Sequence, residues 1–123
     1  MTNQSETDLC NKNIGPNEAV EIAKYLSTNN CLHTLNLYGN NIETKGAVEI
    51  AKCLSTNNCL HTLYLNGNIG AKEVVEITKI LESNYALTNI GLGFTNNKIT
   101  EIINRNKDIF ENRRFKKTKR DII

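Results

Sequence analysis

Residues 32–59 read LHTLNLYGNNIETKGAVEIAKCLSTNNC, and the chain begins again at Leu60 with LHTLYLNGN. When the sequence is shifted against itself by 28 residues, 19–40 lies over 47–68, and 19 of these 22 positions are identical. A fixed period of this length is the signature of a stacked repeat, so it predicts a solenoid before local propensities are considered. The three positions that differ are the pairs Tyr25/Cys53, Asn36/Tyr64 and Tyr38/Asn66.

Each repeat has two halves with different hydrophobic periods. Leu35-Asn36-Leu37 alternates apolar and polar residues, as a half-buried strand does, and the pattern returns at 63–65. The next segment has an apolar stripe at helical spacing, formed by Ala47, Ile50, Ala51 and Leu54. Strands that alternate with helices pair in parallel through right-handed crossovers, so the sequence predicts an α/β fold.

Two units share one pattern of spaced residues, Leu32-x-x-Leu35-x-Leu37-x-x-Asn40-x-Ile42 and Leu60-x-x-Leu63-x-Leu65-x-x-Asn68-Ile69, each followed by a helical half. In these residues the chain resembles the leucine-rich repeat family, in its long ribonuclease-inhibitor-like subclass. The resemblance implies a short horseshoe, with a parallel sheet on the concave face, helices on the convex face and a protein partner bound on the concave face. It also implies that Asn40 and Asn68 satisfy buried backbone groups in the loop after each strand.

The repeat pattern divides the chain into one domain and a tail. Residues 1–112 are predicted to form the leucine-rich repeat domain, and 113–123 the basic C-terminal tail. The units are expected at about 8–31, 32–59, 60–86 and 87–112, the last being a capping unit. Because 113–123 has no periodicity, we expect the last helix to end near Glu111 and the tail to be irregular.

Local signals predict the helix starts and one open edge. Thr44 is the expected N-cap of the second helix, and Gly70 opens the third. The first unit, with a strand near Leu9, is degenerate, and nothing before it resembles a cap. This N-terminal edge is therefore a candidate for self-association by strand addition.

The concave face is the first candidate binding surface. Side chains that alternate with the strand leucines point away from the core. Exposed tyrosine is enriched at binding hot spots, and tyrosine on a sheet also packs against cross-strand neighbours, so a purely structural role is the alternative. The candidate partner-binding residues are Thr34, Asn36, Tyr38, Thr62, Tyr64 and Asn66.

A second pattern consists of two Cys-x-His elements one repeat apart. Cys31 and His33 return as Cys59 and His61, and adjacent repeats stack about 5 Å apart. Two thiolates and two imidazoles would suit tetrahedral zinc. The duplication alone accounts for the second copy, however, so we favour small half-buried thiols and predict no metal site.

The tail is the third candidate. Residues 1–100 carry seven Lys/Arg against nine Asp/Glu, whereas 101–123 carry eight against four. Such a basic run binds phosphates or acidic surfaces, so nucleic-acid binding is the alternative function; a solubilising tail is the structural interpretation. The basic residues of the tail are Arg113, Arg114, Lys116, Lys117, Lys119 and Arg120.

Catalytic and membrane functions lack support in the sequence. No P-loop, HExxH or GxSxG motif occurs, and neither histidine has a nucleophile or an acid at motif spacing, so we predict a non-enzymatic protein without a cofactor. The chain opens without a secretory leader, and no apolar run reaches the roughly 18–20 residues that span a bilayer. We therefore expect a cytoplasmic protein-interaction module without a membrane anchor, whose four cysteines are thiols.

Overall fold

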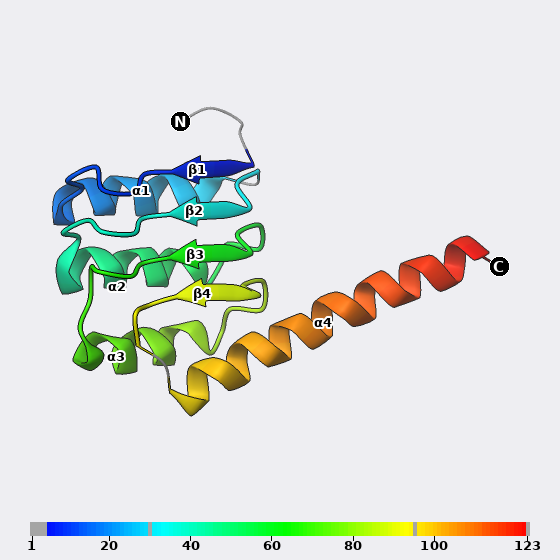
Figure 1. Ribbon diagram of the computed structural model, residues 1–123. Helices are drawn as coiled ribbons and strands as arrows, with labels where there is room; N and C mark the ends of the chain where they lie inside the picture. Colours follow the sequence, from blue (N-terminus) through cyan, green and yellow to red (C-terminus); the bar gives the residue numbers. More distant parts are fainter. Residues whose placement is uncertain (1–4, 30, 95, 123) are drawn as a thin grey trace.

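The computed structural model describes residues 5–29, 31–94 and 96–122, with side chains described up to Arg114. Within these residues four strands alternate with four helices, and each strand–helix pair is one turn of a solenoid (Figure 1). In chain order the elements are β1 (Glu6–Asp8), α1 (Pro16–Thr28), β2 (Thr34–Asn36), α2 (Glu43–Leu54), β3 (Thr62–Tyr64), α3 (Ala71–Leu81), β4 (Asn89–Gly91) and α4 (Asn97–Ile122).

The four strands form one parallel sheet in the order β1-β2-β3-β4. Leu35 pairs with Thr7 on one side and with Leu63 on the other, and Leu63 pairs with Ile90. The 28-residue shift in the sequence is thus the shift between neighbouring strands, which shortens to 27 between β3 and β4. The predicted short leucine-rich repeat solenoid is confirmed.

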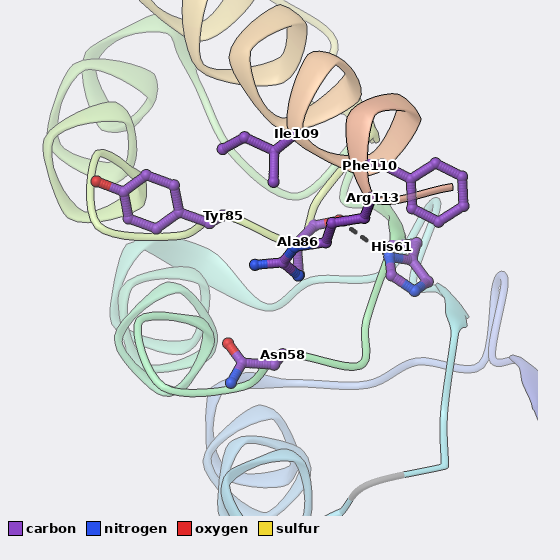
Figure 2. Close-up of a pocket in the computed structure, with 7 residues that line it drawn as sticks. All are labelled: Asn58, His61, Tyr85, Ala86, Ile109, Phe110 and Arg113. Carbon is purple, nitrogen blue, oxygen red and sulfur yellow. Dashed lines mark hydrogen bonds between the residues drawn. The ribbon is translucent and has the colours of Figure 1, made fainter. Parts of the chain in front are cut away.

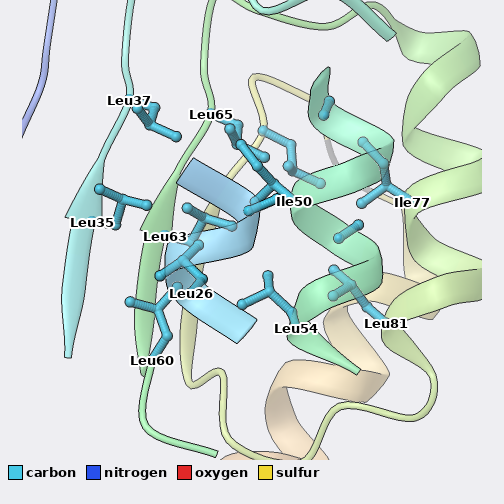
Figure 3. Close-up of a cluster of buried hydrophobic side chains, with 14 of the residues drawn as sticks. Leu26, Leu35, Leu37, Ile50, Leu54, Leu60, Leu63, Leu65, Ile77 and Leu81 are labelled. Carbon is cyan, nitrogen blue, oxygen red and sulfur yellow. The ribbon is translucent and has the colours of Figure 1, made fainter. Parts of the chain in front are cut away.

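The core lies between the sheet and the first three helices (Figure 3). Leu35 and Leu63 point inward from the strands toward Ile50 and Leu54 of α2, and all four are at most 1% exposed. Full burial of such a side chain stabilises the fold by roughly 1.5–3 kcal/mol. The two periods in each repeat therefore supply the two walls of one continuous core.

The last unit is closed by a helix much longer than expected. Ile99 and Ile102 of α4, both 4% exposed, cover the open end of the core. The helix then passes the edge at which the strands begin and extends away from the solenoid (Figure 1). The expectation that it ends near Glu111 is wrong, because it continues to Ile122. No Gly or Pro follows Gly93, and Arg, Lys and Glu have good helix propensity, so nothing in the sequence stops the helix.

Asn40 and Asn68 fill the loops after the strands, as expected. The Asn40 amide donates to the carbonyl oxygens of Leu9 at 2.9 Å and Leu37 at 3.0 Å, and its oxygen accepts from Ile14 N at 3.0 Å. Asn68 donates to Leu37 O at 2.7 Å. Each amide thus joins two successive units and satisfies backbone groups that the loop buries.

A second asparagine series, which the sequence analysis did not identify, lies at the turns from helix to strand. Asn57 donates to Leu26 O at 2.8 Å and Asn84 to Leu54 O at 2.7 Å, in each case one unit back. Each side-chain oxygen also accepts backbone N–H groups two and three residues ahead. The signal was present in the repeat, since Asn29 and Asn57 are 28 residues apart.

The helix starts differ in part from expectation. Gly70 is the N-cap of α3, and its N–H donates to the Glu73 carboxylate at 3.1 Å. Thr44 does not cap α2, whose N-cap is Ile42. The Thr44 hydroxyl donates instead to Glu73 Oε1 at 2.9 Å, and this bond joins the starts of α2 and α3.

Candidate functional site

The concave surface consists of the outward side chains of 34–38, 62–66 and 89–93. Asn36 stands beside Tyr64, and Tyr64 beside Gly91, in one row across the sheet. Thr34 and Thr62 are paired neighbours at the strand starts, and both are half-buried. The structure therefore places the predicted residues on one continuous surface.

Tyr38 is the exposed aromatic residue of the concave surface. Its side chain is 50% exposed. Its backbone N–H donates to Asn36 Oδ1 at 3.0 Å, so the Asn36 side chain holds the turn that presents the ring. The backbone on either side is also fixed, because Leu37 N donates to Tyr64 O and Gly39 N to Asn66 O, both at 2.9 Å. An exposed ring on a hydrogen-bonded backbone loses little conformational freedom when it binds a partner.

Tyr64 lies two positions earlier in its repeat than Tyr38 does, and it packs against β4 instead. Its hydroxyl accepts a hydrogen bond from Asn89 Nδ2 at 3.1 Å. A Cβ atom at Gly91 would lie 2.9 Å from Tyr64 Cδ1, so the ring occupies the space above that glycine. The structural role considered for Tyr64 thus has direct geometric support. Asn89 was expected at a strand entrance of the concave sheet, in register with Thr62, but its hydrogen bond to Tyr64 was not predicted.

Asn66 also has contacts within the chain. Its amide lies 2.9 Å from Gly91 O and 3.2 Å from Gly93 N, distances at which it donates to the first and accepts from the second. Two of the four central candidates, Tyr64 and Asn66, therefore bind β4 and the residues just after it. Tyr38 is the large side chain left facing solvent on this surface.

The two Cys-x-His elements bring their histidines together but form no metal cluster. The rings of His33 and His61 lie 5.4 Å apart between centroids, tilted by 48°. His61 also contacts Phe110 of α4, with 5.9 Å between ring centroids. Cys31 and Cys59 are free thiols. Among the described residues, no group of three or more His, Cys, Asp or Glu could hold a metal ion.

The thiol of Cys53, on α2, is not a candidate nucleophile. Cys53, which replaces Tyr25, donates through its Sγ to Ile50 O at 2.9 Å. Burial raises its pKa to about 12. A thiol with so high a pKa stays protonated at neutral pH and is a poor nucleophile.

The basic segment lies on the projecting part of α4 (Figure 1). Arg113 and Arg114 are exposed there. The side chains of Lys116, Lys117, Lys119 and Arg120 lie outside the described part of the chain. The structure therefore places the backbone of this segment on a helix without showing a site. No helix within the described residues is both long and apolar enough to span a membrane.

The fold and its surfaces define a short leucine-rich repeat solenoid closed by one long helix. No protein-family model and no curated protein matches the sequence. Solved structures of similar fold include the following two. One is leiomodin-1 actin-binding site 2, with 20% identity, coverage of 95% of this chain and 88% of that chain, and a TM-score of 0.68. The other is the tropomodulin C-terminal domain of Caenorhabditis elegans, with 18% identity, coverage of 88% and 70%, and a TM-score of 0.79.

These comparisons correct the predicted subclass. The chain resembles leiomodin and tropomodulin domains in structure, so its assignment to the ribonuclease-inhibitor-like subclass is wrong. The residues that suggested the subclass are the strand leucines and the helical half of each unit. They define a strand–helix repeat and contain no information about how the array ends.

Proposed function

We propose that this chain is a non-enzymatic protein-binding module that holds its partner on the concave surface. The observation that carries the proposal is Tyr38, a half-exposed ring held on a hydrogen-bonded turn. Tyrosine in this setting offers a large apolar contact and a polar tip at low entropic cost. Asn36 lies beside it, while Thr34, Thr62, Tyr64 and Asn66 form the rest of the surface.

Actin is the partner that we propose to test first. The proposal is supported by the similarity in fold to leiomodin-1 actin-binding site 2, which extends over 95% of this chain. Binding is measured by cosedimentation with actin filaments and by a fluorescence titration with actin monomers. Because a tyrosine hot spot contributes about 2 kcal/mol or more, Tyr38→Ala is expected to weaken binding by more than about tenfold.

Val75→Ala is the control for this experiment. Val75 is 55% exposed, close to the 50% of Tyr38, but it lies on α3 and not on the sheet. Its replacement is expected to change actin affinity by less than twofold. Equal losses in the two variants would move the site away from the concave surface, and no binding of either actin form by the parent chain would exclude actin.

A second candidate function rests on the projection of α4. We propose, as the alternative, that 113–122 binds nucleic acid or another acidic surface; the projection of this helix from the solenoid supports this (Figure 1). A chain ending at Asn112 would then lose binding to a DNA oligonucleotide. If all six basic residues met phosphates, log affinity would fall against log salt with a slope of roughly −4 to −5. Unchanged binding by the shortened chain would contradict this function.

A further inference from the structure

A recess of about 340 Å³ lies where α4 passes the turns from helix to strand, away from the concave surface (Figure 2). Tyr85 and Phe110 stand on two sides of it, and Ile109 of α4 lines it between them. The other lining residues are Asn58, His61, Ala86 and Arg113. The volume is at the lower end of the range for small-ligand pockets.

Three of the rings around the recess are held in place by other groups. His61 Nδ1 lies 3.0 Å from Ala86 O, and because a carbonyl only accepts, Nδ1 carries the hydrogen. Phe110 meets the His61 ring edge-on at 5.9 Å between centroids. The guanidinium carbon of Arg105 lies 3.9 Å from the centroid of the Tyr85 ring. The walls are therefore in place before any ligand binds.

Arg113 supplies the charge of the recess. Its side chain extends into the recess from α4 (Figure 2). It has no hydrogen bond or ion pair with any residue that the structure describes, and no acidic residue lines the recess. A guanidinium group offers five N–H donors in a planar fork that matches a carboxylate. An unpaired fork beside aromatic walls is suited to an anion that carries an apolar group.

We propose that this recess binds a carboxylate attached to an apolar or aromatic group. One guanidinium group balances the single charge of a carboxylate, whereas a phosphate monoester brings a charge of about −1.5 to −2 at neutral pH. The apolar group packs against Ile109, Phe110 and Tyr85. Two sources have this chemistry: the C-terminal residue of a protein chain, and a small aromatic or aliphatic carboxylic acid. The site is separate from the concave surface proposed for the protein partner.

The test is an NMR titration of the isotope-labelled full chain with matched probes. The small probes are N-acetylphenylalanine and its C-terminal amide, and the peptide probes are acetyl-Gly-Gly-Phe as the free acid and as the amide. The free acids are expected to bind about tenfold more tightly than the amides, and to shift the resonances of His61 and Phe110, because a charge-assisted bond is lost in the amide. A tighter peptide acid identifies a chain terminus as the source, and a tighter small acid identifies a small molecule.

Two arginine variants test whether the Arg113 guanidinium group binds the carboxylate. Arg113→Gln is expected to weaken the free acids about tenfold and to leave the amides unchanged. Arg114→Gln removes the same charge from the next residue, which does not line the recess, and is expected to change affinity by less than twofold. Equal effects of the two changes, equal binding of acid and amide, or tighter binding of phenyl phosphate than of N-acetylphenylalanine would overturn the proposal.

Discussion

The two ends of the solenoid are finished in different ways. At the N-terminal end, β1 pairs with β2 on one side only, and Leu9 is partly buried. At the C-terminal end, α4 covers the core, and Ile99 and Ile102 are 4% exposed. In a solenoid each unit is stabilised by its neighbours, so a terminal unit depends on whatever replaces the missing neighbour. Only the C-terminal end has such a replacement among the described residues.

The C-terminal cap continues the internal asparagine series from a different element. Asn106 of α4 is fully buried and donates to Leu87 O at 2.9 Å and Asn84 O at 3.2 Å. Arg105 donates to Glu82 O at 3.0 Å and to Asn84 O. The Asn84 carbonyl corresponds to that of Asn29, to which Asn57 of the following unit donates within the repeat. The cap is therefore attached through the same type of contact that joins the repeats.

The largest expected effect follows from removing this attachment. Asn106→Ala leaves the carbonyl oxygen of Leu87 without this donor, whereas Asn84 O keeps its bond from Arg105. An unsatisfied buried group costs roughly 1–3 kcal/mol, so we expect the free energy of unfolding to fall by about 1–3 kcal/mol. Urea unfolding followed by circular dichroism measures the loss.

Asn104→Ala is the matched control, since Asn104 is an exposed residue of the same helix. Exposed substitutions of this kind change stability by less than about 0.5 kcal/mol. A similar small loss in Asn106→Ala would mean that the apolar contacts of α4 suffice to close the end. The two ends of the solenoid would then differ only in whether apolar side chains cover the core.

A smaller effect is expected at the uncapped end without any substitution. The amides of Leu9 and Asn11 are bonded to the carbonyl groups of Asn36 and Tyr38, at 2.8 and 3.0 Å. The N-terminal unit can open without unfolding the rest, so we expect these amides to exchange hydrogen about tenfold faster than those of Leu65 and Asn89, a difference of roughly 1.4 kcal/mol in opening free energy. Equal exchange rates would show that the N-terminal end needs no cap.

The same experiment tests self-association. If a second copy adds to the outer edge of β1, protection of the Leu9 amide would increase with protein concentration. Protection that is independent of concentration would contradict strand addition at this edge. Self-association can therefore be measured separately from partner binding.

The sequence predicted the solenoid because the 28-residue repeat is itself the register of the sheet. The pair Asn36/Tyr64 was expected on the outward face, and it is a cross-strand pair. The different exposure of Tyr38 and Tyr64 could not be predicted, because it depends on Gly91 leaving room for one ring and not the other. That glycine belongs to the fourth unit, which lies outside the near-identical duplication.

The length and course of α4 were also beyond the sequence argument. Hydrophobic periodicity marks a helix only where one face is buried, and α4 leaves the core beyond the buried Asn106, since Phe110, about one turn further, is 46% exposed. Contacts between elements far apart in the chain, such as His61 with Phe110, depend on that course. The recess beside α4 was therefore not predicted from the sequence.

The smallest expected effect concerns the contact between the starts of α2 and α3, which lies away from both ends. Hydrogen bonds from its own backbone N–H and from the Thr44 hydroxyl hold the pKa of Glu73 below its ordinary value. A carboxyl group with a lowered pKa in the folded chain stabilises the fold above its unfolded-state pKa, and this contribution disappears as pH falls through the folded-state pKa. Glu73→Gln should therefore lower the melting temperature slightly at pH 7, and the difference from the parent chain should shrink below pH 4.5. Glu76→Gln, an exposed change on the same helix, is the control variant. A difference that persists at acid pH would mean that Glu73 contributes through packing rather than through its charge.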